Sequence, residues 1–191
     1  MKRIYIPLLL VALLASCSRH VTRVSESSTI DLSGRWNDTD SRLVAEEMVK
    51  DGLSRVWLSD FTNAKNEKPT VIVGVIYNKT SEHISTETFI KDIEREFINS
   101  GQVRLVQGGE SRDQLRAERG DQQEFSSGQT MKKWGREQGA DFMMTGSVNS
   151  IMDQYKKEKV IYYQVDLELS NLETNEKVWI GNKKIKKLVQ N

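Results

Sequence analysis

The sequence predicts an α/β domain in which helices flank a mixed parallel and antiparallel sheet. A run of β-branched residues at 71–76 is followed by an amphipathic helix and then by a second short strand. This order favours a right-handed parallel crossover. Three later segments alternate apolar and polar residues, which is typical of antiparallel strands with one buried face. We therefore expect a sheet that begins parallel and ends as an antiparallel meander.

The first residues of the chain predict export rather than part of this domain. Lys2 and Arg3 precede an apolar run of 12 residues that ends just before the only cysteine, Cys17. The run is too short to span a bilayer, which takes roughly 20 apolar residues, but it is typical of a signal peptide. Leu14-Ala15-Ser16-Cys17 resembles the lipobox of bacterial lipoproteins, which explains a lone thiol at this position. We expect a lipoprotein signal peptide at 1–16 and acylation of Cys17, palmitate included.

Residues 17–37 form a predicted flexible tether between the lipid and the domain. They are rich in Ser, Thr and charged side chains and show no apolar period. At full extension the tether reaches roughly 70 Å at most. Removal of residues 1–16 leaves 175 residues and changes the formal charge from +1 to −1. This balance predicts neither a nucleic-acid partner nor a polybasic membrane site.

The domain at 38–191 is predicted to fold as one unit of helices and strands. Helical patterns cover 38–52, a short piece with Trp57, Leu58 and Phe61 on one side, 85–101, and 130–139 through Met131 and Trp134. Strand patterns cover 71–76, 103–106, 142–151 and 162–172, and a hairpin over Thr174 and Asn175 leads into the last strand. Predicted inward residues include Leu43, Val44 and Met48 in the first helix, and Phe89, Ile90, Ile93, Phe97 and Ile98 in the third.

Two segments carry more specific structural expectations. The run at 71–76 is apolar on both faces, which predicts a central strand buried on both sides. Residues 108–130 are polar but favour helix, so they predict a poorly buried and mobile helical arm.

The side-chain inventory offers no catalytic or metal-binding pattern. His20 and His83, with one lipidated cysteine, make no zinc site of ordinary spacing. No Gly-rich phosphate loop, serine elbow or HExxH motif is present. Lys184 and Lys186 share one side of a strand, where lysines commonly discourage wrong pairing although an anionic partner is an alternative. We therefore predict a protein that is not an enzyme and needs no cofactor.

Four segments of the chain together resemble the LpoB family of outer-membrane lipoproteins, the activators of bifunctional penicillin-binding proteins. They are Asn78-Lys79-Thr80, Asn99-Ser100-Gly101, Gly139-Ala140-Asp141-Phe142, and the hairpin from Leu172 through Trp179 to Gly181. The resemblance covers roughly residues 35 to 187. It implies a fold similar to the N-terminal domain of TolB, no active site, and docking on a peptidoglycan synthase. The short tether without proline departs from the long Pro-rich tethers of better-known members.

The resemblance also implies a partner and a site. The partner would be a class A penicillin-binding protein, reached by a monomer anchored in the outer membrane and facing the periplasm. Asn78, Lys79 and Thr80 match the family's Asn-Arg-Thr segment and lie beyond the carboxyl end of a strand, where α/β sheets often bind partners. The alternative for this loop is a capping role at a helix entry. The alternative for the protein is a lipoprotein of an outer-membrane assembly or secretion complex of the curli-export type.

Overall fold

The computed structural model describes residues 21–25, 28–125 and 138–190, with side chains left undescribed at 123–125. The helices are α2 (Asp38–Leu53), α3 (Val56–Lys65), α4 (Thr86–Ser100) and α5 (Gly109–Phe125), and the strands are β1 (Thr70–Asn78), β2 (Arg104–Leu105), β3 (Phe142–Tyr155), β4 (Glu158–Asn171) and β5 (Lys177–Gln190). Cys17, the predicted signal peptide and the helix predicted through Met131 and Trp134 lie outside the described residues.

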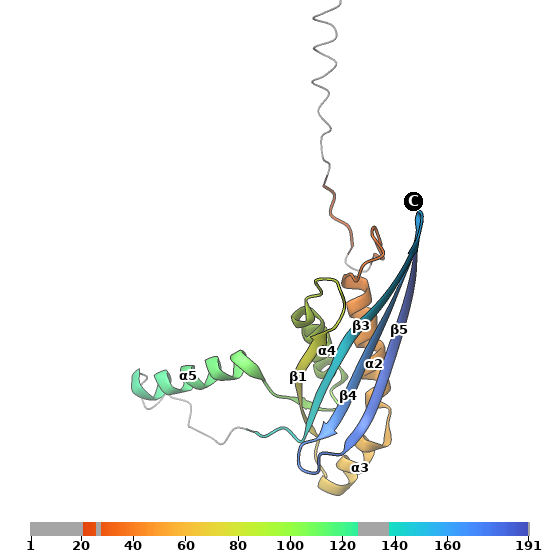
Figure 1. Ribbon diagram of the computed structural model, residues 1–191. Helices are drawn as coiled ribbons and strands as arrows, with labels where there is room; N and C mark the ends of the chain where they lie inside the picture. Colours follow the sequence, from red (N-terminus) through yellow and green to blue (C-terminus); the bar gives the residue numbers. More distant parts are fainter. Residues whose placement is uncertain (1–20, 26–27, 126–137, 191) are drawn as a thin grey trace, which may run out of the picture.

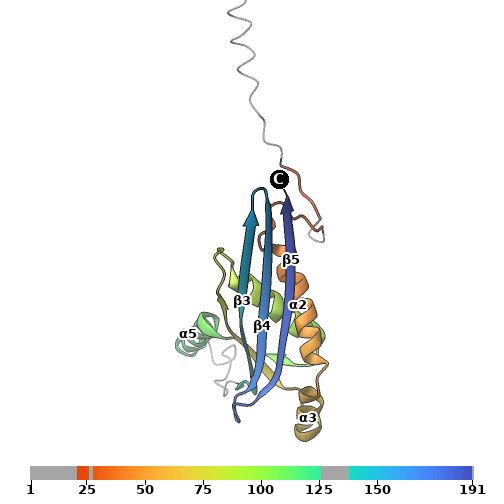
Figure 2. The ribbon, with the colours of Figure 1, turned by 45° about the vertical axis from the view of Figure 1, so that its right-hand side comes forward.

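The five strands form one mixed sheet in the order β2-β1-β3-β4-β5 (Figure 1). β1 runs parallel to both β2 and β3, whereas β4 runs antiparallel to both of its neighbours, β3 and β5. Helices α2 and α4 lie behind the sheet in Figure 2, and α3 lies at one end. No helix among the described residues covers the front of the sheet, which we call the open face. The predicted α/β class and the parallel-to-antiparallel order are confirmed.

Helix α5 projects away from the sheet and its covering helices (Figure 1). Its sequence is mostly polar, and its apolar Leu115 is 45% exposed. The prediction that residues 108–130 favour helix and are poorly buried is confirmed for the part that α5 covers. None of the helices in the described ranges is both long and apolar enough to cross a membrane.

The core lies between α2, α4 and the helix-facing side of β3 and β4. Alternate residues of these strands are almost fully buried, as their apolar alternation predicts: Phe142, Met144, Val148, Ile161, Tyr163, Val165, Leu167 and Leu169. The helices contribute Val44, Met48, Val49, Phe89, Ile93 and Phe97. At the lower end of the sheet, the rings of Trp57 and Phe61 contact Phe142 with centroid separations of 4.9 and 5.5 Å. The predicted contact of this short helix with the sheet is confirmed.

Polar caps fix the starts of α2 and α4. The side chain of Asn37 accepts a hydrogen bond from the Asp40 amide, and the Asp40 carboxylate accepts one from the Asn37 amide, which is a capping box. Ser85 caps α4, and Gly101 ends it with a φ of 63°. A residue with a Cβ would be strained at this φ, so a glycine suits the helix end.

The prediction of β1 as a central strand buried on both sides is wrong for its second half. β2 pairs only with Thr70 and Val71, so beyond that point β1 is an edge strand, and β3 occupies the centre. A bulge between Val73 and Ile76 also changes the register. Val75 is consequently 56% exposed. Apolar composition alone does not reveal that the neighbouring strand is two residues long.

Two residues predicted to face the core do not. Ile98 is 62% exposed because Phe97, its neighbour along α4, takes the buried position and a helix turns about 100° per residue. Leu43 is 47% exposed for the same reason beside buried Val44. The buried stripe of a helix covers only part of its circumference, and Leu43 and Ile98 lie just outside it.

We expect Gly146→Ala to destabilise the domain. A Cβ at Gly146 would lie 2.2 Å from the Asp166 carbonyl oxygen and 2.6 Å from a Leu167 methyl. Relief of this clash must displace the β3–β4 pairing, at a cost of about 1–3 kcal/mol. Urea unfolding measures the effect. Gly120→Ala in exposed α5, where a Cβ meets nothing within 4 Å, is the control, and an equal effect of both changes would contradict the prediction.

Candidate functional site

The loop between β1 and α4 holds the three residues predicted to bind a partner. The Asn78 amide Nδ2 donates to the Glu82 carbonyl at 2.7 Å. Its Oδ1 accepts from both the amide (3.0 Å) and the hydroxyl (2.7 Å) of Thr80. The Thr80 hydroxyl oxygen in turn accepts from the Glu82 amide at 3.1 Å. Asn78 and Thr80 therefore use their side chains to hold the loop in shape, as short polar side chains do in turns.

Lys79 has a different position from its two neighbours. Its amide donates to the Val148 carbonyl at 2.8 Å, which fixes its backbone to β3, while its side chain is exposed. Together with Tyr77, Glu168 and Ile180 it borders a shallow depression of about 250 Å³ on the open face. Of the three predicted residues, Lys79 is therefore the one with an exposed, charged side chain that a partner can contact.

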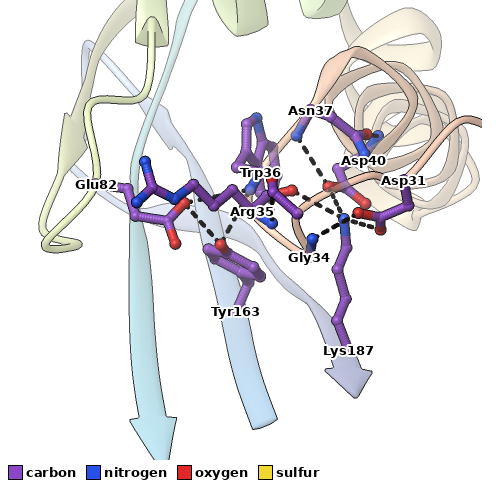
Figure 3. A network of polar contacts seen from close by, with 10 residues as sticks. Asp31, Gly34, Arg35, Trp36, Asn37, Asp40, Glu82, Tyr163 and Lys187 are labelled. Carbon is purple, nitrogen blue, oxygen red and sulfur yellow. Dashed lines mark hydrogen bonds and ion pairs between the residues drawn. The ribbon is translucent and has the colours of Figure 1, made fainter. Parts of the chain in front are cut away.

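The same loop is attached to the core through Glu82, a residue that the sequence analysis did not single out. Its Oε2 accepts from the Tyr163 hydroxyl at 2.7 Å and from the Trp36 amide at 3.3 Å (Figure 3). The Tyr163 oxygen itself accepts from the Trp36 amide at 3.0 Å. Burial, and then the hydrogen bond to Glu82, raise the pKa of Tyr163. The phenol therefore stays protonated and donates to the carboxylate.

Trp36 joins this network from a segment assigned to the predicted tether. Its ring makes edge-on contacts with Phe89 of α4 and Tyr163 of β4, at centroid separations of 5.9 and 5.7 Å. The Glu82 Oε1 atom is buried without a hydrogen-bond partner in the described part of the chain. The carboxylate therefore depends on the bonds that its other oxygen makes with Tyr163 and Trp36.

Three charged residues, Asp31, Asp40 and Lys187, fasten the same segment to the end of β5, and we call them the clamp. Lys187 Nζ lies 2.7 Å from Asp31 and 2.6 Å from Asp40, and it donates to the Arg35 carbonyl at 3.1 Å (Figure 3). Its side chain is 11% exposed. Burial by itself lowers the pKa of Lys187, but the bonds to Asp31 and Asp40 outweigh it and the net pKa is raised.

The contacts with the domain therefore begin at Asp31, seven residues before the start of α2. One sequence signal was available, because Trp36 is a large aromatic residue in an otherwise polar segment. Glu82 and Lys187 carried no such signal. Their partners lie 46 to 156 positions away along the chain, so no local pattern links them.

The chemistry of these groups is that of binding and support. Among residues 21–25, 28–125 and 138–190, no three His, Cys, Asp or Glu side chains are placed to hold a metal ion. The fold and the loop define a small mixed α/β domain whose accessible features are an open sheet face and a braced loop at its margin.

A model of the family described as peptidoglycan-synthase activator LpoB matches residues 40–185. This match spans about three quarters of the chain, and the chain belongs to the LpoB family. The family is one of activators of peptidoglycan synthases. No protein of curated function matches the sequence.

The solved structures that the chain matches include two LpoB domains. The LpoB C-terminal domain from Escherichia coli is 17% identical, with 78% of this chain and 99% of that chain covered and a TM-score of 0.43. The LpoB C-terminal domain from Salmonella enterica is 17% identical, with 68% and 93% covered and a TM-score of 0.37. Lipoprotein GNA1162 from Neisseria meningitidis is 10% identical, with 63% and 83% covered and a TM-score of 0.42.

We expect Tyr163→Phe to lower the free energy of unfolding by about 1–3 kcal/mol, since the Glu82 carboxylate loses its hydroxyl donor in a partly buried position. Urea unfolding measures the change. Tyr162→Phe is the matched control, because the Tyr162 hydroxyl bonds only to Gln164 among the described residues and faces the open side. A similar loss of free energy of unfolding in both variants would show that the hydrogen bond from Tyr163 to Glu82 does not stabilise the domain more than an exposed one.

We expect Lys187→Met to release the segment at 31–36, because methionine keeps the apolar stem but removes the charge that Asp31 and Asp40 share. The loss is about 1.5–3 kcal/mol for hydrogen bonds to charged groups. Since the pKa of Lys187 is raised, this stabilisation is complete below pH 10.5 and is lost as the pH rises through the higher folded value. Hydrogen exchange at 31–36 measures the release, and Lys186→Met, on the open face, should leave it unchanged.

Proposed function

We propose that the protein is a lipid-anchored periplasmic regulator that binds and activates a class A, bifunctional penicillin-binding protein. The observation that carries this proposal is the match of the LpoB family model to residues 40–185. The lipobox-like Leu14-Ala15-Ser16-Cys17 supports anchoring through acylated Cys17. We propose the outer membrane, on its periplasmic side, as the place of the anchor, and a monomer as the working form.

Activation by such a protein requires no catalytic residue of its own. An activator shifts a synthase toward its active conformation when it binds that conformation more tightly than the idle one. A preference of 1.4 kcal/mol changes the ratio of the two conformations about tenfold. The surface that contacts the synthase must therefore be rigid enough to discriminate between them. The hydrogen bonds of Asn78, Thr80 and Glu82 give the loop at 78–82 this rigidity.

We propose that Lys79 is the contact residue of this loop and that Asn78 and Thr80 act by holding it in place. The depression beside Lys79 has Tyr77 and Ile180, 61% and 70% exposed, at its margin. A cation next to exposed apolar side chains suits a partner surface that carries a carboxylate beside an apolar group.

The clamp limits how far this surface can be from the membrane. The chain makes 14 steps from Cys17 to Asp31, and they reach about 48 Å at most. The estimate from the sequence, with a tether that continued to residue 37, was roughly 70 Å. The docking region of the synthase must therefore lie no farther from the anchored lipid than about 48 Å plus the length of the domain.

The test is the rate of glycan polymerisation and the extent of crosslinking by a class A synthase from the same organism, with and without the purified acylated protein. We expect both to increase. Lys79→Glu should raise the concentration needed for half of the stimulation roughly fivefold to tenfold, because it places a like charge against an acidic partner.

Lys68→Glu is the matched control, since Lys68 is also an exposed lysine beside β1 but at the opposite end of the strand. Stimulation that is unchanged by Lys79→Glu would reject the docking loop. The absence of stimulation of every class A synthase of the organism would reject the activator function.

A further inference from the structure

The sheet extends beyond its helices at one end of the molecule. The β3–β4 hairpin and the end of β5 rise past α2 and α4, while α3 lies at the opposite end (Figures 1 and 2). We call residues 150–160 and 186–190 the strand tip. Three large apolar residues of the tip share the open face by their cross-strand register, and they are Ile151 (68% exposed), Tyr155 (72%) and Leu188 (61%).

Apolar side chains continue around the tip to the side where the N-terminal segment arrives. Met152, on the helix-facing side of β3, is 46% exposed. Leu32 is 92% exposed and follows Asp31, which the clamp holds against Lys187 at the end of β5. Exposed apolar groups on both sides of one narrow end are costly in water, so this arrangement indicates a surface that is covered in the working protein.

The tip is also basic, although the chain as a whole is nearly neutral. The turn between β3 and β4 consists of Lys156 and Lys157, and Lys186 lies on the open face of β5. Over the part of the chain that the structure describes, none of these three lysines forms an ion pair. Lys156 Nζ lies 5.2 Å from the centre of the Tyr155 ring. Asp153 and Glu158 are the acidic residues of the tip, so the lysines prevail.

The clamp brings the proposed lipid anchor to this same end. Lys187 holds Asp31 and the Arg35 carbonyl, and Gly34 lies so close to Val189 that an added Cβ would be 2.4 Å from its methyl group. The 14 chain steps from Cys17 to Asp31 would have a root-mean-square span of about 20 Å for a tether of the predicted kind. An acyl chain on Cys17 would therefore keep the tip near the lipid surface continuously.

We propose that the strand tip is a membrane contact that rests on an anionic lipid surface next to the anchor. The inference rests on the proposed acylation of Cys17. Apolar side chains enter the headgroup region, and the lysines lie among the anionic headgroups, as in other surface-bound segments. The loop at 78–82 stays free, because Asn78 pairs with Val148 and lies seven residues, roughly 23 Å, before Tyr155 along β3.

The test uses the full acylated chain, reconstituted into vesicles of phosphatidylethanolamine and phosphatidylglycerol. Tyr155→Trp places a fluorescent reporter on the tip, and Val56→Trp, at a position 74% exposed on α3, places one at the other end. The emission of the unmodified chain is subtracted. With brominated acyl chains in the vesicles, we expect the reporter at 155 to lose at least about half of its added emission and the reporter at 56 to lose almost none.

Charge reversal separates lipid recognition from mere proximity. In the Tyr155→Trp chain, Lys156→Glu with Lys157→Glu should reduce quenching to the level of position 56. Each lysine near an anionic surface favours contact roughly fivefold. Lys65→Glu with Lys68→Glu, two exposed lysines at the α3 end, should leave quenching unchanged.

Each other outcome overturns the membrane contact. Equal quenching at positions 155 and 56, or none at either, shows that the tip has no preference for lipid. A shift in emission that grows with protein density but is insensitive to brominated lipid shows contact between copies of the chain.

Two further measurements test the proposed function independently of the membrane contact of the strand tip. The mass of the N-terminal peptide shows whether Cys17 is acylated, and the synthase assay shows activation. If the chain is not acylated, the same vesicles are added to it directly, and the tip must then be quenched on its own for the inference to stand.

Discussion

Burial of a single face of β3 and β4 is the constraint on which the rest of the structure depends. Alternate residues of both strands are almost completely covered by α2 and α4, which leaves the intervening residues on the open face. Tyr163 lies at the middle of this arrangement. Its ring is fully buried, and its hydroxyl is the point where the loop at 78–82 and the N-terminal segment meet through Glu82 and Trp36. The position of the core thus determines where both segments are fixed.

A one-sided sheet suits a protein that regulates by contact. An enzyme needs convergent side chains in a cleft, whereas a regulator needs a surface that keeps its shape when a partner binds. Here the loop beside the open face is braced by its own side chains, with Asn78 and Thr80 directed at the backbone and Lys79 left available. Rigidity and exposure are divided between neighbouring residues. The same three residues therefore support both the docking hypothesis and the alternative of a loop that supports a helix entry.

The clamp gives the domain a defined direction relative to its proposed anchor. Because Lys187 holds Asp31 and Asp40 at the end of β5, the chain leaves the domain beside the strand tip rather than at the start of α2. This shortens the reach of the tether and points α3 away from the proposed membrane. The overall charge of the chain does not predict a basic surface. The antiparallel register creates one by bringing Lys186 to the end of the sheet that carries the Lys156-Lys157 turn.

The sequence by itself determined the local elements, because the periods of its apolar residues are local. The alternation in β3 and β4, the apolar face of α4 and the order of strands and helices were all predictable, and the LpoB-like segments were recognisable by their residues and spacing. The tertiary structure alone decided what depends on distant partners: the edge position of β1 beyond a two-residue β2, and the network of Trp36, Glu82 and Tyr163. In each case the contact joins residues far apart in the chain. No local period encodes such a contact, so it becomes visible only when the sheet is assembled.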